Sequence, residues 1–524
     1  MKTKLCPLVL LLVALATGRA SAAKPSQSRS ASRPNIVYIL ADDMGIGDIS
    51  CLYSNCAWKT PNLDRLAREG RTFTDAHSAS GVCTPSRYTL LTGRYSWRGS
   101  LKSSVLNGYS PSLIETGRMT VASFLRQQGY STMMVGKWHL GLDWVQTGPT
   151  PQSVDFDKRF AGGPLDHGFE AFFGISASLD MPPYVYLEGD RSTIVPTDRV
   201  DDSPKPRMWR AGVVGSDFRH EEVQPKFLQR SLDYLDARAR STDQKPFFLY
   251  LALASPHTPI IPTPEFKGKT GTNPYGDFVA QVDAAVGEIL ARLTRHGLAT
   301  NTLVFFTADN GCSPAANLAE LRTLHHDPSA GYRGHKADLF EGGHRVPFLT
   351  RWPAQIPAGT RCGQTIGQLD LLATCAELCG VPLPVNSAED SVSILPLLKG
   401  GEKPLRNRKG LVHHSNNGSF AVREGRWKLL LVPDSGGWSE PKPGSVPGNL
   451  PRFQLYDLET DPAERNRLET RHPAIVTRLG RLLLASVRNG RSTPGPAQPY
   501  DAQAHWPQLS WSSAFEKARP RAQP

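Results

Sequence analysis

Apolar segments and amphipathic stretches alternate along most of the chain. Four continuous apolar segments are typical of buried strands: residues 36–41, 131–135, 247–252 and 303–307. Helical spacing of apolar positions marks four further stretches: residues 61–69, 119–128, 222–240 and 278–296. Because a helix precedes each of the last three strands, the pattern predicts an α/β fold. Its large, mostly parallel or mixed sheet would be sandwiched by helices.

A Pro-rich passage at residues 381–404 separates this pattern from a shorter one. Strand signals follow at residues 410–413, 420–423 and 427–432. After a loop rich in Gly and Pro come the segment 455–458 and a charged helix that ends near Arg488. We therefore expect a second, smaller α+β domain. The predicted organisation is a signal peptide at residues 1–22, a linker at 23–33, a large domain at 34–384, the small domain at 385–490 and an irregular tail at 491–524.

The N-terminus has the form of an export signal. Lys2 and Lys4 precede an apolar run at residues 5–16, and small residues at 20–22 offer a cleavage site. The run is shorter than the roughly 20 residues that a membrane-spanning helix needs, and no later stretch reaches that length. We therefore predict export to a periplasmic, secreted or lysosome-like compartment, without a stable membrane anchor.

The composition adds a basic charge and an odd number of thiols. The formal net charge is +12 at pH 7. Such a charge favours a polyanionic partner, which nucleic acid, anionic lipid and sulfated glycan would all satisfy, and it also serves solubility. Seven of the eight cysteines lie beyond the signal peptide. Because seven thiols cannot all pair in disulfides within the chain, at least one is expected to have another use, and Cys83 is the candidate. Cys51 and Cys56 could close a short loop, but the sequence does not fix any pairing.

The most informative segment is the C-x-P-x-R sequence that runs from Cys83 to Arg87. Pro85 suits the first turn of a helix, and Arg87, four residues after Cys83, falls on the same helical face. The partial positive charge of a helix N-terminus would lie beside both side chains. The thiol, the guanidinium and the helix end would then face one anion.

Two of the predicted strands end in oxygen-bearing side chains. Asp42 and Asp43 follow one of them, and Asp309 and Asn310 follow another. Either pair alone would suit a turn. Ligands gather at the carboxyl edge of such a sheet, where three carboxylates and an amide oxygen make a site for a hard cation. The pattern favours calcium over zinc.

Three further segments carry side chains suited to bind an anion or move a proton. Lys137 and His139 would lie on one face of an extended chain, with Trp138 on the other. His257 follows a buried strand, and Lys336 precedes a glycine-rich segment. A single Lys or His in such a place is more often an exposed residue without a specific function. The functional interpretation of these residues therefore depends on the motifs around them.

Together these motifs resemble the sulfatase family. The match covers residues 35–466 and includes the continuation of C-x-P-x-R to Gly93 and Arg94 and the phrase Gly-Lys-Trp-His-Leu-Gly around Lys137. The resemblance implies an alkaline phosphatase-like fold, in which residues 34–384 are the catalytic domain, and arylsulfatase-type hydrolysis of sulfate esters. It implies that a maturation enzyme oxidises Cys83 to formylglycine. It also implies one calcium ion per subunit, bound by the modified Cys83, Asp42, Asp43, Asp309 and Asn310.

The resemblance further assigns roles to the catalytic residues. Arg87 and calcium would stabilise the formylglycine, and Asp309 would assist deprotonation of its attacking hydroxyl. The sulfate oxygens would be neutralised by Lys137, His257 and Lys336. His257 or Lys336 would protonate the leaving group, and His139 would take the proton when sulfate is expelled. A hydrated aldehyde suits this chemistry because its second hydroxyl can expel sulfate by breaking the C–O bond.

Two other functions fit the same motifs. A phosphate mono- or diesterase could use the same fold and metal edge, although one metal site ringed by Lys and His favours the monoanionic sulfate. A non-catalytic protein that binds sulfated glycans could keep the fold without the modification. The substrate is set by loops such as residues 142–160 and 182–214, which carry no interpretable motif. A sulfated small molecule or glycan is expected, a carbohydrate foremost, and nucleic acid is not.

Overall fold

Five parallel strands form the centre of the large sheet, in the order β11-β1-β10-β4-β5. Ala41 of β1 lies beside Ala308 of β11, and Leu40 lies beside Ala252 of β10. Nearly all their side chains are buried, as is usual for parallel strands covered on both faces. Their bounds are β1 Asn35–Ala41, β4 Ser131–Lys137, β5 Ala171–Ile175, β10 Phe247–Ala252 and β11 Thr302–Ala308.

Antiparallel pairing extends the sheet on both sides, so the prediction of a mostly parallel or mixed sheet is confirmed. β12 pairs antiparallel with β11 and β2, and β6 pairs antiparallel with β5 and β7. These outer strands have two to four residues, which is too short for the apolar pattern to reveal them. Their bounds are β2 Arg71–Phe73, β6 Leu187–Glu188, β7 Arg191–Ser192, β12 Phe348–Arg351 and β13 Thr360–Cys362.

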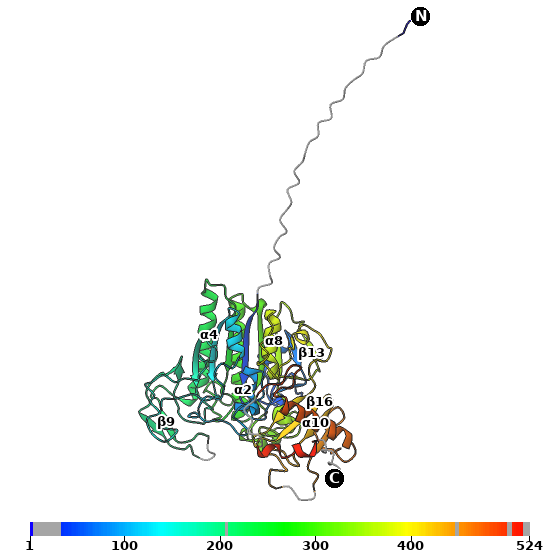
Figure 1. The fold of residues 1–524 in the computed structure, drawn as a ribbon. Helices are drawn as coiled ribbons and strands as arrows, with labels where there is room; N and C mark the ends of the chain where they lie inside the picture. The colour runs from blue at the N-terminus through cyan, green and yellow to red at the C-terminus, as the bar shows by residue number, and fades with distance from the viewer. Residues whose placement is uncertain (4–32, 205–207, 446–449, 500–505, 517–524) are drawn as a thin grey trace. The chain divides into compact units, whose positions relative to one another are not determined.

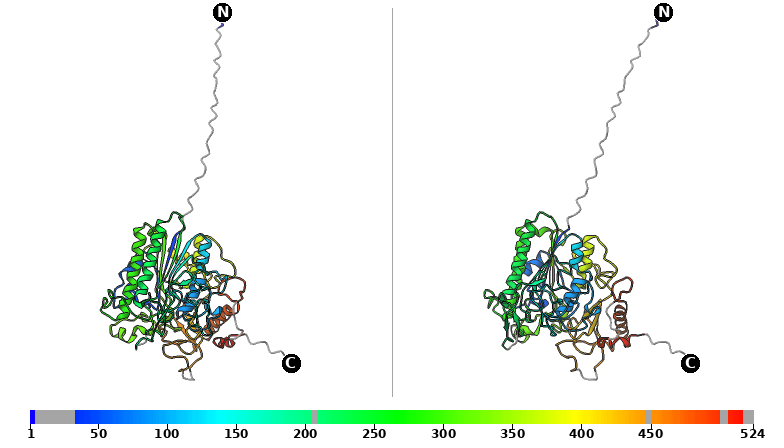
Figure 2. Two further views of the ribbon diagram at one scale, coloured as in Figure 1. Left: turned by 90° about the vertical axis from the view of Figure 1, so that its left-hand side faces the viewer. Right: turned by 60° about the vertical axis from the view of Figure 1, so that its left-hand side comes forward.

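Helices cover both faces of this sheet (Figures 1 and 2). Val37 and Ile39 of β1 face the core beneath α1, α4 and α5, whereas Ile36, Tyr38 and Leu40 face the core beneath α2, α3 and α8. The alternation of side chains along the strand thus divides the core into two layers. The helices are α1 Pro61–Arg68, α2 Cys83–Thr92, α3 Val121–Gln127, α4 Val223–Arg240, α5 Pro274–Arg295, α6 Leu318–Thr323, α7 Glu341–His344, α8 Leu371–Cys379 and α9 Leu395–Leu398.

The start of α5 shows how local sequence sets a boundary. The helix begins four residues before the apolar pattern indicates, because Asn273 caps it with its side-chain oxygen, which accepts from the Gly276 N–H (3.2 Å). Pro274 takes the first helical position, where a missing N–H does no harm.

The C-terminal part contains a separate antiparallel sheet of four strands, in the order β15-β16-β17-β18. α10 packs on it through Leu479 and Leu483, which confirms the smaller α+β region. The tail that was expected to be irregular contains two 3-10 turns, Pro507–Leu509 and Ser512–Ala514, whose neighbouring aromatic residues are buried against this sheet. The bounds are β15 Leu411–His414, β16 Phe420–Glu424, β17 Trp427–Leu430, β18 Gln454–Asp457 and α10 Pro473–Arg488.

Two short strand pairs complete the fold. β3 pairs with β14, and β8 pairs antiparallel with β9. β3 lies on the chain just before α2, and the second pair lies in one of the loops expected to contact substrate. Their bounds are β3 Ala76–His77, β14 Ile366–Gly367, β8 Asp198–Val200 and β9 Gly212–Val214.

The structure is a computed structural model that describes residues 1–3, 33–204, 208–445, 450–499 and 506–516. The predicted signal peptide and linker fall almost wholly outside these residues. The described residues from Pro34 onward form one compact unit, within which the boundary at 384 stays a prediction. None of the described helices is long and apolar enough to cross a bilayer. The seven cysteines in the described ranges are free thiols.

Candidate active site

Four oxygen-bearing side chains gather at the carboxyl edge of the large sheet. Because Ala41 pairs with Ala308, the residues that follow these two strands lie side by side. They are Asp42, Asp43, Asp309 and Asn310, each at most 1% exposed. Asp43 has a positive φ of 63°, and its N–H donates to Asp309 Oδ1 at 3.2 Å. The turn after β1 is therefore fastened to the end of β11.

Cys83 lies beside this edge as the first residue of α2. Its side chain is buried, and its sulfur lies within 4.8 Å of carboxylate oxygens of Asp42 and Asp309. Arg87, one turn later, donates from Nε and Nη2 to Asp309 Oδ2 at 3.0 and 2.8 Å. Its Nη1 donates to the Lys137 carbonyl at 3.0 Å. The helix thus brings the sulfur and the guanidinium to the same carboxylate, as their spacing predicts.

Three basic side chains surround the carboxylates. Lys137 Nζ donates to Asp42 Oδ2 at 2.6 Å, and Lys336 Nζ donates to Asp43 Oδ2 at 2.7 Å. His257 Nε2 lies 3.5 Å from the same oxygen of Asp43. Lys137 is fully buried, whereas His257 and Lys336 are 7% and 6% exposed. The side of the cluster that reaches solvent is therefore the side of His257 and Lys336.

The pKa values of the two neighbouring carboxylates move in opposite directions. Burial alone would raise the pKa of Asp42, but nearby cations, Lys137 foremost, outweigh it and hold this pKa well below its usual range. Burial and then the charge of Asp42 raise the pKa of Asp309 to about 6, against the effect of Arg87. Two adjacent buried carboxylates resist simultaneous ionisation, and a cation between them would relieve that repulsion.

His139 departs from its predicted conformation. β4 ends at Lys137, and His139 has a φ of 56°, so the two side chains do not follow one extended chain. The His139 N–H donates to the Ser176 carbonyl (3.0 Å), and its Nε2–H donates to the Leu106 carbonyl (2.8 Å). The lone pair is therefore on Nδ1, which is buried without a partner among the described residues. Burial, followed by Lys137, holds the pKa of His139 well below 6.5, so the ring is neutral.

No motif in the chain marks the segments that hold His139. Leu106 and Ser176 contribute backbone carbonyls, and a carbonyl leaves no mark on the choice of side chain. Leu106 also donates its N–H to Thr84 Oγ1 at 3.2 Å, which ties the same segment to the residue after Cys83. A sequence motif consists of side-chain types, so these backbone contacts of Leu106 and Ser176 become visible only in the folded structure.

The oxygen cluster fits a hard cation. Asp42 Oδ1 and Asn310 Oδ1 are buried and accept no hydrogen bond from any described residue. The set around them consists of three carboxylates and one amide, which are the ligand types that calcium prefers. The residues predicted as ligands are thus brought together, and their unpaired oxygens are consistent with a bound ion.

A family model described as Sulfatase matches residues 34–381, which is more than half of the chain. The chain belongs to the sulfatase family. It is 33% identical to an N-acetylgalactosamine-6-O-sulfatase of Bacteroides thetaiotaomicron, over 90% of this chain and 96% of that relative. It is 34% identical to arylsulfatase A of Homo sapiens, over 93% of each chain, and 32% identical to the steryl-sulfatase of Homo sapiens, over 84% of this chain and 85% of that one.

A solved structure gives the same result for the fold. It comes from work on the metabolism of multiple glycosaminoglycans by Bacteroides thetaiotaomicron, and it matches this sulfatase with a TM-score of 0.77 and 32% identity. The match covers 87% of this chain and 99% of the other. The protein is therefore a sulfuric ester hydrolase with an alkaline phosphatase-like fold.

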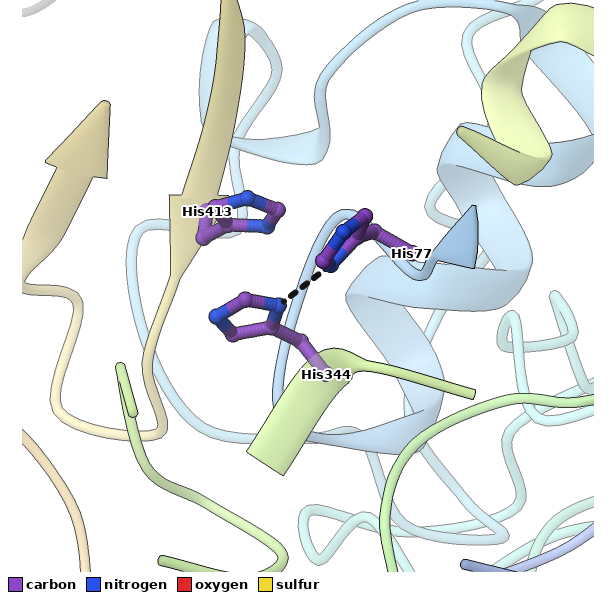
Figure 3. A group of neighbouring side chains, drawn as sticks. All are labelled: His77, His344 and His413. Carbon is purple, nitrogen blue, oxygen red and sulfur yellow. Dashed lines mark hydrogen bonds between the residues drawn. The ribbon is translucent and has the colours of Figure 1, made fainter. Parts of the chain in front are cut away.

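The sulfatase has a second buried cluster of titratable side chains, which the sequence analysis did not predict. Figure 3 shows His77 of β3, His344 of α7 and His413 of β15, which come together from three separate segments. The Nδ1 atoms of His77 and His344 are 3.1 Å apart. The rings of His344 and His413 stack with their centroids 3.7 Å apart and their planes 12° apart. We call this group the histidine cluster.

Ion pairs surround the histidine cluster. Asp75 pairs with Arg423 at 2.7 Å, and Glu341 pairs with Lys428 at 3.0 Å. Arg423 Nη1 also lies 3.0 Å from His77 Nε2, and Lys428 Nζ lies 3.0 Å from His344 Nε2. Two stacked rings and two adjacent cations suit this group poorly to a divalent metal. The histidine cluster instead joins the large-sheet region to the C-terminal sheet, which supplies Arg423 and Lys428.

The loop before Cys83 is fastened to the same C-terminal sheet. Ser80 Oγ and the Gly81 N–H both donate to the His414 carbonyl, at 2.7 and 3.0 Å. The His414 N–H donates in return to the Ala79 carbonyl at 3.0 Å. Strand β15 thus supports the segment that leads into Cys83.

Proposed function

We propose that this sulfatase hydrolyses sulfate esters of carbohydrates, with a formylglycine derived from Cys83 as its nucleophile and one calcium ion per subunit as its cofactor. The observation that carries the proposal is the position of Cys83 beside Asp42 and Asp309, at the start of α2. Burial raises the pKa of the Cys83 thiol, so the unmodified side chain would remain protonated and unreactive. A formylglycine-generating maturation enzyme would replace it with an aldehyde, whose hydrate offers hydroxyl groups at this position.

The surrounding side chains suit the charge changes of sulfate ester cleavage. Burial opposes a charge on Lys336, but Asp43 outweighs it and raises the pKa of this lysine, which therefore stays cationic. Lys137, Lys336 and His257 can neutralise sulfate oxygens, and the last two, on the open side, can protonate the leaving alcohol. His139 can accept a proton at Nδ1, since its Nε2–H is engaged by the Leu106 carbonyl. Arg87 orients Asp309 beside the reacting residue.

Calcium would be held by Asp42, Asp43, Asp309 and Asn310 together with the modified residue at position 83. The bound ion would supply charge stabilisation next to that residue. The unpaired Oδ1 atoms of Asp42 and Asn310 support this assignment.

A carbohydrate substrate is supported by the relative at 33% identity, which acts on a sulfated amino sugar according to its name. The basic charge of the chain agrees with a polyanionic sulfated glycan. Relatives named for aryl and steryl sulfates have similar identity, so substrate assays decide between these classes. Export through residues 1–22, to a periplasmic, secreted or lysosome-like compartment, would place the enzyme where such glycans occur.

Mass spectrometry of the peptide that contains residue 83 tests the nucleophile. Conversion replaces the thiol and one hydrogen by a carbonyl oxygen, and we expect this mass in active material. An intact thiol in fully active protein would contradict the proposal, and an intact thiol without turnover would favour a binding protein. A panel of sulfated sugars, assayed beside an aryl sulfate, tests the substrate class.

Paired assays with aryl sulfate and aryl phosphate test the nearest alternative. A phosphonate monoester hydrolase of Agrobacterium radiobacter matches this chain with a TM-score of 0.54 and 18% identity, which shows a shared fold alone. We expect the sulfate ester to be the better substrate. Faster turnover of the phosphate ester would reverse the assignment.

A further inference from the structure

A pocket of about 270 Å³ opens among the loops near the catalytic cluster, and no catalytic residue lines it. Its volume lies just below the range of roughly 300–1,000 Å³ that is typical of ligand pockets, which suits one sugar unit rather than a long chain. The residues that the argument uses are Asn107, Tyr109, Met181, Arg199, Arg210 and Gly212.

Two walls of this pocket are attached to His139. One wall begins at Asn107, directly after Leu106, whose carbonyl accepts from His139 Nε2. The other wall includes Met181, five residues after Ser176, whose carbonyl accepts from the His139 N–H. The Leu106 N–H also donates to Thr84, the neighbour of Cys83. Short backbone segments therefore connect the pocket to His139 and, through Leu106, to the residue after Cys83.

The polar groups of the pocket are mainly hydrogen-bond donors. Arg199 is exposed and makes no side-chain hydrogen bond or ion pair with any described residue, while its charge acts on Tyr109. Arg210 is about half exposed, with Nη2 3.4 Å from Asp180 Oδ2. Asn107 uses its side-chain oxygen to accept from the Tyr109 N–H at 2.9 Å, which leaves its NH₂ group to donate. Two guanidinium groups and an amide are the donors that bind a carboxylate or a sulfate.

The pocket is formed by closely packed backbone. A Cβ at Gly108 would lie 2.3 Å from the Pro182 carbonyl oxygen, and a Cβ at Gly212 would lie 2.2 Å from Pro182 Cβ. The Arg210 N–H donates to the Asp180 carbonyl at 3.2 Å, which fixes the start of this guanidinium's side chain. The backbone that carries the donors is thus held in place, which reduces the entropy that the loops lose on binding.

We propose that this pocket binds a second anionic group of the substrate, carried by a sugar unit next to the one that bears the cleaved sulfate. The inference rests on the proposed function, since it needs a sulfated carbohydrate in the active site. The anionic group is a carboxylate, as in a uronic acid, or another sulfate. Both present planar or tetrahedral oxygens to the guanidinium groups of Arg199 and Arg210.

The test uses three disaccharides with the same cleavable sulfate ester: one with a neutral neighbouring sugar, one with a uronic acid and one with a second sulfate. We expect the wild-type enzyme to prefer an anionic disaccharide through a lower KM. In the variant Arg199→Gln/Arg210→Gln, the ratio of kcat/KM for the anionic over the neutral disaccharide falls roughly 10- to 100-fold, as expected for the loss of charged hydrogen bonds. Arg159→Gln, at an exposed arginine that does not line the pocket, is the matched control and leaves this ratio unchanged.

Comparison of the two anionic disaccharides identifies the group that the pocket binds. Preference for the uronic acid indicates a carboxylate, and preference for the second sulfate indicates a sulfate. Equal kcat/KM for all three disaccharides in the wild-type enzyme would overturn the inference. So would a double variant that loses activity on the neutral and anionic disaccharides by the same factor. Failure of the proposed function is distinguishable from both, because it appears as absent turnover of every sugar and of an aryl sulfate, or as unconverted Cys83.

Discussion

The oxygen cluster at Asp42 and the histidine cluster at His77 are both fully buried and both rich in charge, yet they are bonded differently. Around Asp42, three atoms that could form hydrogen bonds have no partner among the described residues: Asp42 Oδ1, Asn310 Oδ1 and His139 Nδ1. Around His77, three atoms also lack a hydrogen-bond partner among the described residues: His413 Nε2, Arg345 Nε and Glu464 Oε1. The unpaired oxygen of Glu464, however, lies 2.8 Å from Lys428 Nζ, whereas Asp42 Oδ1 lies 3.5 Å from Arg87 Nη2.

We interpret the first cluster as a site that binds an ion and reacts, and the second as a site that holds the fold. An unpaired buried oxygen costs about 1–3 kcal/mol, and a bound cation at Asp42 and Asn310 would remove that cost. A buried ion pair adds little net stability, but the loss of one partner leaves an uncompensated charge. Substitutions in the first cluster should therefore affect catalysis, and substitutions in the second should affect folding.

The largest effect is expected for Cys83→Ala. Loss of the nucleophile should lower kcat/KM for an aryl sulfate by a factor on the order of 10⁴ or more, while the free energy of unfolding changes by less than about 1.5 kcal/mol. Cys375→Ala, at an equally buried thiol in α8, controls for the loss of a buried sulfur and keeps its activity. Undiminished activity of Cys83→Ala would refute the role of this residue.

Lys428→Met should produce the opposite outcome. It leaves Glu341 and Glu464 buried without their shared cation, so we expect a loss of about 3–5 kcal/mol in the free energy of unfolding. Denaturant unfolding measures this loss, and kcat per folded molecule should stay close to that of the wild type. Lys226→Met removes an exposed ion pair with Glu222 and should cost no more than about 0.5 kcal/mol. Equal losses of unfolding free energy in the two variants would show that removing the cation of the buried ion pairs costs no more than removing that of an exposed pair.

Calcium distinguishes the clusters through ligand-linked stability. At a free concentration near 100 times its Kd, calcium should stabilise the wild-type enzyme by about 2.7 kcal/mol relative to chelator. Asp42→Asn should lose most of this gain, because it removes one of the carboxylates at the cation site. Lys428→Met should retain it. Thermal unfolding with calcium or chelator measures the shift, and the same shift in Asp42→Asn would place the ion elsewhere.

The smallest effect is the share of a single histidine in the pH dependence of stability. Burial lowers the pKa of His77, His344 and His413 in the folded state, so unfolding takes up protons once the pH falls below the unfolded value of about 6.5. These rings therefore stabilise the fold above that pH, and the stability declines on acidification by up to about 1.4 kcal/mol per pH unit for each ring. The charged groups that face them are Asp75, Glu341, Glu464, Arg345, Arg423 and Lys428.

His413→Asn should reduce the steepness of this decline by the share of one ring. Unfolding free energies measured from about pH 7.5 down to about pH 5.5, on both sides of the unfolded histidine pKa, would show it. A slope equal to that of the wild type would assign the acid sensitivity to other groups.

The predictability of the two clusters follows from where their residues lie in the chain. Asp42, Asp43, Asp309 and Asn310 directly follow long apolar strands, so strand order alone brings them together. Cys83 and Arg87 are one helical turn apart, which local geometry fixes. The histidines offer no such link: His77 and His344 are 267 residues apart, and each lies on an element of four residues or fewer.

The other differences between the predicted and the observed structure have similar causes. The conformation of His139 depends on a left-handed turn and on two carbonyls from distant segments, neither of which a pattern of side chains records. The edge strands are too short for periodicity, and the buried aromatic residues of the tail stand among Pro and polar residues without any repeat. Long elements and local motifs were therefore predictable, and contacts between short distant segments were not.

The bond between Ser80 and His414 spans 334 residues and has a consequence for synthesis on the ribosome. The side chains expected to carry out the reaction have all been translated by Lys336, but the strand that braces the approach to Cys83 emerges much later. Trp506, Trp511 and Phe515, which pack against that strand's sheet, emerge last. A nascent chain, or one shortened by a late stop codon, would thus contain every side chain expected to react. It would still lack strand β15, which supports the segment before α2.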